Sequence, residues 1–421
     1  MQTRTNSGRY VSRLTSGTLA VVMAGGRGER LRSLTLHRCK PATPFGGKFR
    51  IIDFVLSNCV NSGIRQIAVL TQYKAQPLIQ HIQRGWSYLR GEMGEFVELI
   101  PAQQQMGEHW YRGTADSVYQ NLEFIRSHHP THVLILAGDH IYKMDYGPMI
   151  AYHEISEADI TVGVVDVPLD RAHEFGIMTT DDANRVVKFA EKPARPQPIK
   201  GHPDLARASM GIYVITLERL EQLLNDDAAD EKSSHDFGRN IIPPVIDRLR
   251  VFAYPFHDVE TQAQNYWRDV GSVDAYYEAN MELVALNPEL NIYDVQWPIW
   301  TYQAQLPPAK FVLDEEGRRG IAINSMVAGG CIISGATVRQ SLLSMEVRVE
   351  DHSIVESSVL LPGVTVGRNC RIRHAILDEQ CIVPDGLTIG HDAERDGERF
   401  DVTKGGVVLV TQDMLRTLPK S

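Results

Sequence analysis

Aliphatic residues recur about every six positions from about Ser325 to Gly390, and no helical period is present there. Glycine, asparagine and aspartate fill the spaces, as in GATVRQSLL and GVTVGRNCRI. A six-residue aliphatic period is typical of a parallel β-helix, in which each coil adds short strands to a stack. Some steps are four or five residues, so a sandwich of short strands stays the alternative. The recurring residues are Ile332, Val338, Leu343, Val349, Ile354, Leu360, Val366, Ile372, Ile376, Ile382 and Ile389.

The chain before this repeat alternates short apolar runs with amphipathic stretches. The apolar runs are nearly continuous, as in strands of a parallel sheet that is covered on both faces. These predicted strands are Leu19–Ala24, Ile67–Thr71, Val133–Ala137 and Ile160–Val165. The predicted helices between them include Ile52–Ser62, Ala75–Arg84 and Ala115–His128. The alternation indicates βαβ units in a Rossmann-like, mostly parallel sheet, with ligands bound beyond the carboxyl ends of its strands.

A chain of 421 residues is too long for one ordinary core, and the change in pattern predicts where it divides. We expect an α/β chain with an N-terminal extension at 1–17 and a catalytic domain at 18–295. A linker follows at 296–324, after a start rich in proline, tryptophan and tyrosine. The β-helix domain is expected to occupy 325–421 and to supply surface for assembly.

The net charge of −9 argues against a nucleic-acid-binding protein, whose affinity rests on a basic surface. The five cysteines show no CxxC pair and no metal-ligand spacing, which is typical of reduced thiols. The first residues, MQTRTNSG, lack the apolar core of a signal peptide. No apolar run approaches the roughly 20 residues that cross a bilayer. We therefore expect a cytoplasmic protein without a membrane partner.

The first chemical signal is the stretch AVVMAGGRGERLRSLTLHRCKPATPFGG, from Ala20 to Gly47. A strand runs into Gly25, Gly26 and Gly28, whose backbone N–H groups can approach a triphosphate closely. Arg30 and Lys40 add positive charge for a leaving pyrophosphate. The spacing fits neither the dinucleotide fingerprint nor the Walker loop, and a purely structural turn is the alternative for the glycines alone.

Two aspartates follow strand-like runs. In VLILAGDHIY, Asp139 comes at the carboxyl end of a strand, and in YWRDVGS, Asp269 lies in a comparable polar break. Mg²⁺ prefers one or two carboxylates together with phosphate oxygens. The pair therefore predicts a Mg²⁺ site, while a capping role for Asp139 is the structural alternative.

The stretch VVKFAEKPARP places Glu191 and Lys192 at the end of a strand, just before a proline. A carboxylate can accept hydrogen bonds from sugar hydroxyls, and an ammonium can bind a sugar phosphate as a point charge. A solvated surface pair is the alternative interpretation.

Together these stretches resemble the nucleotidyltransferases that make nucleotide-sugars, and among them the bacterial ADP-glucose pyrophosphorylases (glucose-1-phosphate adenylyltransferases). The resemblance covers the chain from about Leu19 to Leu418. Four further stretches are similar to that branch, namely PFGGKFRIIDFVLSN, TQYKAQPLIQHIQRGW, HWYRGTADSVYQN and FGIM. It implies that ATP and glucose 1-phosphate give ADP-glucose and diphosphate for glycogen synthesis, and that the β-helix is left-handed.

The resemblance also implies roles for individual residues. It makes Asp139 the essential metal-binding aspartate, with Asp269 sharing the ion, and it places Arg30 and Lys40 on the nucleotide phosphates. Lys192 belongs with them in the catalytic set. The implied glucose 1-phosphate site comprises Tyr111, Gly176, Glu191, Lys192 and Ser209. Gln103, in PAQQQ, stands where the family reads the base, and with Gly25, Gly26 and Gly28 it makes up the implied ATP-binding set.

Regulation is also implied by the resemblance. Relatives are homotetramers activated by a sugar phosphate or pyruvate and inhibited by AMP, ADP or phosphate, with effectors bound between the two domains. The basic residues expected there are His37, Arg38, Arg50, Arg371, Arg373 and Arg399. His37 stands where enteric members carry a lysine, so the identity of the effector stays open.

Three other functions remain as alternatives. A UDP- or dTDP-sugar pyrophosphorylase would share the glycine turn and Asp139. A catalytically silent regulatory subunit tends to lose basic residues of the nucleotide loop, which this chain retains. A β-helix acyltransferase would need a longer solenoid and a catalytic histidine, whereas His352, His374 and His391 are scattered.

Overall fold

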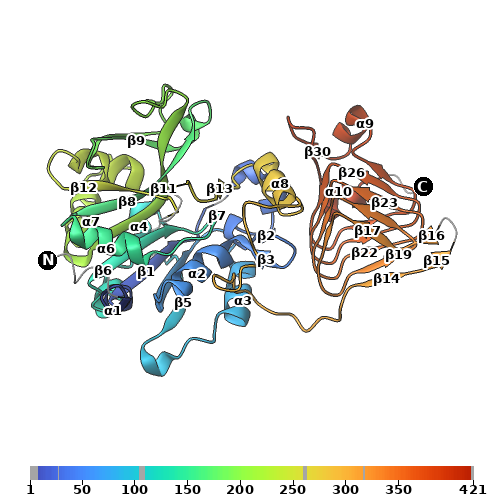
Figure 1. Cartoon of the computed structure of the whole chain (residues 1–421), viewed down its shortest axis with the longest axis horizontal. Helices are drawn as coiled ribbons and strands as arrows, with labels where there is room; N and C mark the ends of the chain where they lie inside the picture. Colours follow the sequence, from blue (N-terminus) through green and yellow to red (C-terminus); the bar gives the residue numbers. More distant parts are fainter. Residues whose placement is uncertain (1–7, 27, 104–109, 259–262, 316–317, 419–421) are drawn as a thin grey trace.

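The structure is a computed structural model that describes residues 8–26, 28–103, 110–258, 263–315 and 318–418. Two lobes lie side by side (Figure 1). The N-terminal lobe contains the mixed helices and strands, and the C-terminal lobe is a stack of short strands. Helix α8 (Val273–Glu282) lies at the junction of the lobes.

The N-terminal lobe is organised around a nine-stranded sheet with the central order β10-β9-β11-β6-β1-β4-β5, to which β8 and β12 add beside β11. Strands β5, β4, β1 and β6 form a continuous parallel run, and only β11 and β10 run against the direction of the other seven. The strands are β1 Thr18–Met23, β4 Gln66–Thr71, β5 Phe96–Pro101, β6 His132–Ala137, β8 Ile160–Pro168, β9 Gly176–Thr180, β10 Val186–Glu191, β11 Leu205–Thr216 and β12 Val251–Pro255.

Alternate residues of β1 pack into different cores, because successive side chains of a strand point to opposite faces. Ala20 and Val22 belong to one hydrophobic cluster, and Leu19 and Val21 belong to the other. Both faces are therefore covered, which confirms the prediction of a buried, mostly parallel sheet. The covering helices are α1 Gly8–Ser16, α2 Ile51–Asn61, α3 Gln76–Gly85, α4 Thr114–Tyr119, α5 Leu122–Ser127, α6 Gly147–Ile155 and α7 Leu217–Ala228.

The helix predicted at Ala115–His128 is divided into α4 and α5. The break lies at Asn121, whose backbone leaves the helical region at ψ 14°. Its side-chain amide donates to the hydroxyl of Tyr111 and to the carbonyl of Ser117. Asparagine side chains compete with the backbone for hydrogen bonds in this way, which amphipathic periodicity does not register.

The C-terminal lobe is a parallel β-helix of three sheets that share one core. Stacked residues are 17 positions apart over most of the lobe, as for Val349, Val366 and Val383. The principal strands are β14 Lys310–Val312, β17 Ile321–Ile323, β18 Met326–Val327, β19 Ile332–Ser334, β20 Thr337–Arg339, β21 Leu342–Leu343, β22 Arg348–Val349, β23 Ile354–Glu356, β24 Val359–Leu360, β25 Thr365–Val366, β26 Arg371–Arg373, β27 Ala375–Leu377, β28 Ile382–Val383, β29 Thr388–Ile389, β30 Asp401–Val402 and β31 Val408–Val410.

Four of the aliphatic residues that define the predicted repeat do not point into this core. Each comes directly before the residue that does, so each points out of the coil. Ile382, for example, is 63% exposed, whereas Val383 is buried. The four residues are Ile332, Ile354, Ile376 and Ile382, and their inward neighbours are Ile333, Val355, Leu377 and Val383.

The stack begins earlier than the six-residue pattern indicates. Strands β14 and β17 pair in parallel with β19 and β20, and both lie within the range predicted as a linker, 296–324. The sequence between them, DEEGRRG, interrupts the aliphatic spacing and contains a small hairpin of β15 (Asp314–Glu315) and β16 (Arg318–Arg319). Of the predicted N-terminal extension, residues 1–7 lie outside the described part of the chain.

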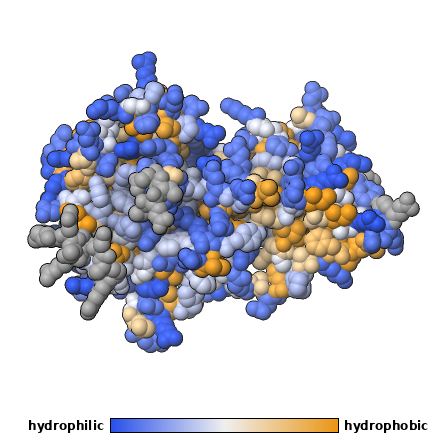
Figure 2. All heavy atoms as spheres, viewed as in Figure 1, coloured by the Kyte–Doolittle hydropathy of each residue, from blue (hydrophilic) through white to orange (hydrophobic). Residues whose placement is uncertain are grey.

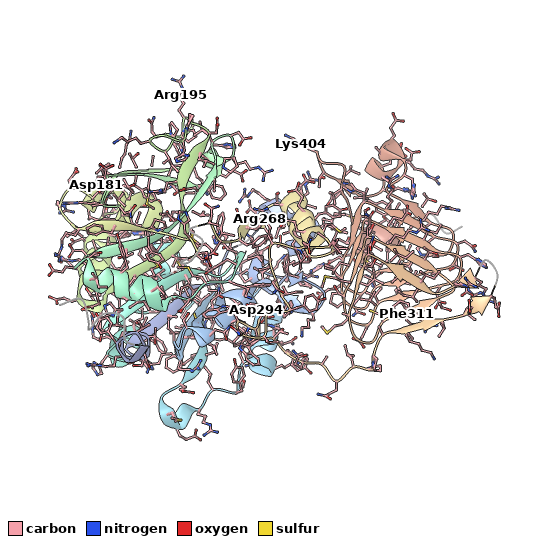
Figure 3. The ribbon with its side chains drawn as sticks, viewed as in Figure 1. Asp181, Arg195, Arg268, Asp294, Phe311 and Lys404 are labelled. Carbon is pink, nitrogen blue, oxygen red and sulfur yellow. The ribbon has the colours of Figure 1, made fainter. Side chains whose placement is uncertain are left out.

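A shared hydrophobic cluster joins the two lobes. The outward residues of the third β-helix sheet, including Leu342, Val359 and Ile376, pack with Tyr276 and Ala279 of α8. The segment between the lobes is also fixed to the N-terminal lobe. Its Asp294, labelled in Figure 3, accepts from Lys143 at 2.6 Å.

On the face that Figure 2 shows, the N-terminal lobe is mostly hydrophilic, whereas apolar residues form a band across the β-helix lobe. Phe311 and Ile323 are exposed apolar residues of this second lobe. None of the helices in the described part of the chain combines the length and apolarity that crossing a membrane requires.

The inward and outward positions of the β-helix predict different costs of truncation. Leu360 is fully buried in the coil, so Leu360→Ala should lower the free energy of unfolding by about 2–5 kcal/mol. Ile382→Ala, at an exposed position, should change it by less than about 0.5 kcal/mol. Urea unfolding of both variants measures the difference, and similar losses at the two positions would contradict the assignment of inward and outward residues.

Candidate active site

A cavity of about 600 Å³ opens beyond the carboxyl ends of β1 and β6. Seven of the residues singled out from the sequence line it, and they come from turns, loops and short 3₁₀ segments. Parallel strands direct their carboxyl ends to one edge of a sheet, so residues distant in sequence meet there. These seven are Gly25, Gly26, Gly28, Arg30, Lys40, Tyr111 and Asp139.

The glycine turn follows β1 directly and needs glycine at one position for a steric reason. Gly28 has φ +66°, and a Cβ there would meet Cβ of Lys40 at 3.0 Å. The absence of that atom lets the Lys40 stem pack against the turn. Around Gly26 there is nothing within 4 Å of a built Cβ, so this part of the turn faces open space in the cavity.

Strand pairing brings the two predicted metal-binding aspartates together. Asp139 lies in the turn between β6 and β7 (His140–Tyr142), and β7 pairs antiparallel with β13 (Trp267–Asp269). In that register Asp269 is opposite His140. The ammonium of Lys40, from the 3₁₀ turn Lys40–Ala42, donates to Asp139 Oδ2 at 2.9 Å and to Asp269 Oδ1 at 2.8 Å.

Electrostatics keep this cluster ionised. Burial alone would raise the pKa of Asp139, but the Lys40 ammonium, followed by smaller effects of His140 and Arg30, lowers it below the usual range. The pKa of Asp269 is lowered by the same ammonium against the effect of burial. Burial would lower the pKa of Lys40, and the two carboxylates raise it instead. All three groups are therefore charged at neutral pH.

Two residues of the cluster were not predicted. His140 Nε2 lies 3.6 Å from Asp139 Oδ1, and its ring contacts Trp267 edge to face. Glu174 accepts from Arg30 at 2.7 Å, and Arg30 also reaches Asp269 at 3.3 Å. His140 could have been predicted because it is next to Asp139 in the sequence. The sequence around Glu174 contains no feature that would mark it as a site residue.

The donor set of the cluster suits a hard divalent cation. Asp139, His140 and Asp269 each offer a ligand atom, and these atoms lie within 4.8 Å of one another. Asp139, in the turn between β6 and β7, and Asp269, at the end of β13, supply the oxygen ligands that Mg²⁺ prefers. The residues present therefore fit a metal ion.

Of the predicted sugar-phosphate residues, Tyr111 alone is among the described residues that line the cavity. Its hydroxyl accepts from the Asn121 amide at 2.9 Å. Glu191 lies behind the lining residue Asp236: burial, followed by the charge of Asp236, raises the pKa of the Glu191 carboxyl. Gly176 makes room for this arrangement, since a Cβ there would come within 2.8 Å of Glu191 Oε2.

Three further predicted residues, Lys192, Ser209 and Gln103, are not among the described residues that line the cavity. Lys192 follows β10 with φ +47° and is half-exposed, 3.8 Å from Glu191. Ser209 lies in β11, where its hydroxyl accepts from Gly211 N–H at 3.2 Å. Gln103 is exposed beyond the end of β5. The residues that follow it, 104–109, are outside the described ranges.

The six predicted effector residues form separate groups. Arg38 is buried and binds Asp378 (2.8 and 3.3 Å) and Glu379 (2.9 Å), while Arg50 reaches Glu379 at 3.2 Å. These two acidic residues form the turn between β27 and β28, so the contact crosses the lobe junction. His37 also contacts the β-helix lobe, since its Nε2 lies 3.6 Å from Asp413 Oδ2.

The other predicted effector arginines lie elsewhere on the β-helix. Arg371 and Arg373 are exposed on β26, and Arg399 pairs with Asp396 at 2.8 Å. Among the described residues, no hydrogen bond or ion pair links these three to Arg38 or Arg50.

The buried pair across the lobes predicts a large stability effect. Asp378→Ala leaves Arg38 buried with Glu379 as its remaining partner, so the free energy of unfolding should fall by about 3 kcal/mol, the lower end for a broken buried pair. Asp351→Ala removes a more exposed partner of Arg318 and should cost at most about 1 kcal/mol. Equal losses in urea unfolding would contradict this account of the lobe junction.

Comparison with known proteins shows the family to which the chain belongs. The Nucleotidyl transferase family matches residues 19–285, and the family of GlmU-like C-terminal hexapeptide domains matches 307–410. A glucose-1-phosphate adenylyltransferase of Nitrosococcus oceani is 59% identical over 414 residues, 98% of each chain. Those named for Methylococcus capsulatus and Methylobacillus flagellatus are 59% and 58% identical over 97% of this chain, and over 96% and 97% of their own lengths. The chain therefore belongs to the Nucleotidyl transferase family, in the branch of the glucose-1-phosphate adenylyltransferases.

Proposed function

We propose that this protein transfers the AMP part of ATP to glucose 1-phosphate, releasing diphosphate and supplying ADP-glucose for glycogen synthesis. One observation carries the proposal: the Asp139 and Asp269 carboxylates meet beside the glycine turn, at the carboxyl edge of a buried sheet. The names of relatives that match nearly the whole chain support the choice of substrates.

In the proposed reaction an oxygen of glucose 1-phosphate attacks the α-phosphorus of ATP. The bond between the α-phosphorus and the bridging oxygen breaks, and diphosphate leaves with the electron pair of that bond. Both reactants are anions, so positioning and charge neutralisation matter more than proton transfer. No covalent enzyme intermediate and no histidine base are needed.

The nucleotide side of the cavity supplies positive charge and backbone donors. Gly25 and Gly26 border the space where the phosphates would lie, and the cationic residues Arg30 and Lys40 also line it. These groups would stabilise the charge that develops on diphosphate as it leaves. Mg²⁺ held by Asp139 and Asp269 would neutralise phosphate charge and align the two reactants.

The sugar side is proposed to involve Tyr111, Glu191 and Lys192. The Lys192 ammonium is half-exposed and has only a loose contact with Glu191, so it is available to a sugar phosphate. Glu191 would accept from glucose hydroxyls. Gly176 and Ser209 shape this region from β9 and β11.

Two other functions make different predictions for a substrate panel. A UDP- or dTDP-sugar pyrophosphorylase would release diphosphate with UTP or dTTP. A silent regulatory subunit would release none. With ATP, UTP and dTTP each offered beside glucose 1-phosphate, we expect diphosphate with ATP, and a preference for UTP or dTTP would overturn the substrate assignment.

Regulation and assembly belong to the same proposal. An anionic effector that binds Arg38 and Arg50 has to compete with Asp378 and Glu379, which already hold these guanidinium groups. We also propose a homotetramer that works in the cytoplasm. The five cysteines are buried free thiols, as expected in a reducing compartment.

The metal-binding carboxylate should be essential for turnover. Asp139→Asn keeps the side-chain size but removes the charge, so kcat should fall by at least about 10²–10³-fold. Asp294→Asn, which affects a carboxylate outside the cavity, serves as the control and should leave kcat within about twofold. Diphosphate release under saturating substrates measures both. Near-normal turnover of a folded Asp139→Asn variant would refute the proposed function.

Lys192 should affect one substrate selectively. Loss of a charge-assisted contact of about 1.5–3 kcal/mol predicts that Lys192→Ala raises the KM for glucose 1-phosphate about 10–100-fold and leaves the KM for ATP nearly unchanged. Lys200→Ala, at an exposed lysine, is the matched control. Initial rates with each substrate varied in turn check the prediction, which fails if the two KM values rise together.

A further inference from the structure

Lys40 occupies a central place between the two carboxylates. Its side chain is 6% exposed, and its ammonium lies 2.9 Å from Asp139 Oδ2 and 2.8 Å from Asp269 Oδ1. The stem packs against Gly28, where a Cβ would come within 3.0 Å of Lys40 Cβ. The lysine is thus anchored at its base, and its head neutralises two acidic groups that would otherwise repel each other.

The other oxygen of each carboxylate faces a different group. Asp139 Oδ1 lies 3.6 Å from His140 Nε2, and Asp269 Oδ2 lies 3.3 Å from Arg30 Nη2. The two oxygens that converge on one point are therefore those that hold the ammonium. They are also the oxygens best placed to share a cation, because Asp139 directly precedes β7 and Asp269 of β13 is paired with His140, the first residue of β7.

An ammonium and a divalent ion cannot use these two oxygens together. Mg²⁺ binds oxygen at about 2.0–2.1 Å. An ammonium hydrogen-bonded to the same oxygens would then lie within about 4 Å of the ion, where the two positive charges repel strongly. One of the two cations has to leave.

We propose that Lys40 and the divalent ion are alternative occupants of the Asp139–Asp269 pair, and that binding of the metal–nucleotide complex transfers the lysine head from the carboxylates to the nucleotide phosphates. The flexible lysine stem permits this movement, and Lys40 lines the same cavity as the glycine turn. The inference deepens the proposed function, on which it rests for the identity of the nucleotide.

The exchange has a consequence for the order of binding. A metal ion without nucleotide has to displace an ammonium that gains no new partner, so the protein alone binds the ion weakly. When nucleotide is present, its phosphates bind the displaced Lys40 ammonium. Metal and nucleotide therefore bind with positive coupling, which is reciprocal by linkage.

The test is a titration of the full-length protein with Mn²⁺ alone, with free Mn²⁺ counted by electron paramagnetic resonance. Lys40→Met removes the competing charge, and we expect it to tighten Mn²⁺ binding at least about tenfold although it slows turnover. Lys143→Met removes a lysine of the Asp294 pair and should bind Mn²⁺ like the parent protein. Unchanged or weaker binding by Lys40→Met would overturn the proposal.

A second variant tests whether the Mn²⁺ ion binds at Asp139. Adding Asp139→Asn to Lys40→Met should abolish the gain in Mn²⁺ affinity, and a gain that persists would place the ion elsewhere and overturn the proposal. If Lys40→Met does not fold, Lys40→Gln is titrated instead. Tighter Mn²⁺ binding without ADP-glucose formation by the parent protein would refute the proposed function alone, whereas normal ADP-glucose formation without tighter binding would refute the exchange alone.

Discussion

The pairing of β7 with β13 is the contact on which the proposed chemistry depends, because it sets Asp139 beside Asp269. Two carboxylates this close both stay ionised only when a cation neutralises them, and Lys40 supplies that charge. The position of Lys40 depends in turn on the glycine turn, since only Gly28 leaves room for its stem. The pairing of β7 with β13 and the glycine turn thus bring together Asp139, Asp269 and Lys40, which are far apart in the sequence.

The β-helix contributes to the same arrangement from the other side of the lobe junction. Its turn residues Asp378 and Glu379 hold Arg38 and Arg50, which lie on either side of the segment that carries Lys40. The Arg50 guanidinium also donates to the Ala42 carbonyl at the end of that segment. Packing of α8 against the third sheet keeps this turn in place (Figure 1). Direct contacts therefore connect the β-helix to the segment that carries Lys40.

Much of the fold and part of the candidate site could be predicted from the sequence, and the long-range contacts could not. Continuous apolar runs identified the central strands, and the residues that follow them, Gly25 and Asp139, do line the cavity. The six-residue period identified the β-helix but misplaced residues such as Ile382, because two adjacent aliphatic residues in a short strand do not reveal which one points inward. Contacts such as Arg38 with Asp378, 340 residues apart, leave no local pattern, and neither does the pairing of Arg30 with Glu174.

The central claim is that Asp139 and Asp269 share one divalent ion next to the glycine turn. Anomalous diffraction from crystals of the protein with Mn²⁺ and a non-hydrolysable ATP analogue tests it most directly. The account predicts one anomalous peak within about 2.5 Å of an oxygen of each aspartate, with the Lys40 head turned to the phosphates. A peak bound by only one aspartate, or a Lys40 head still between the two carboxylates, would contradict it.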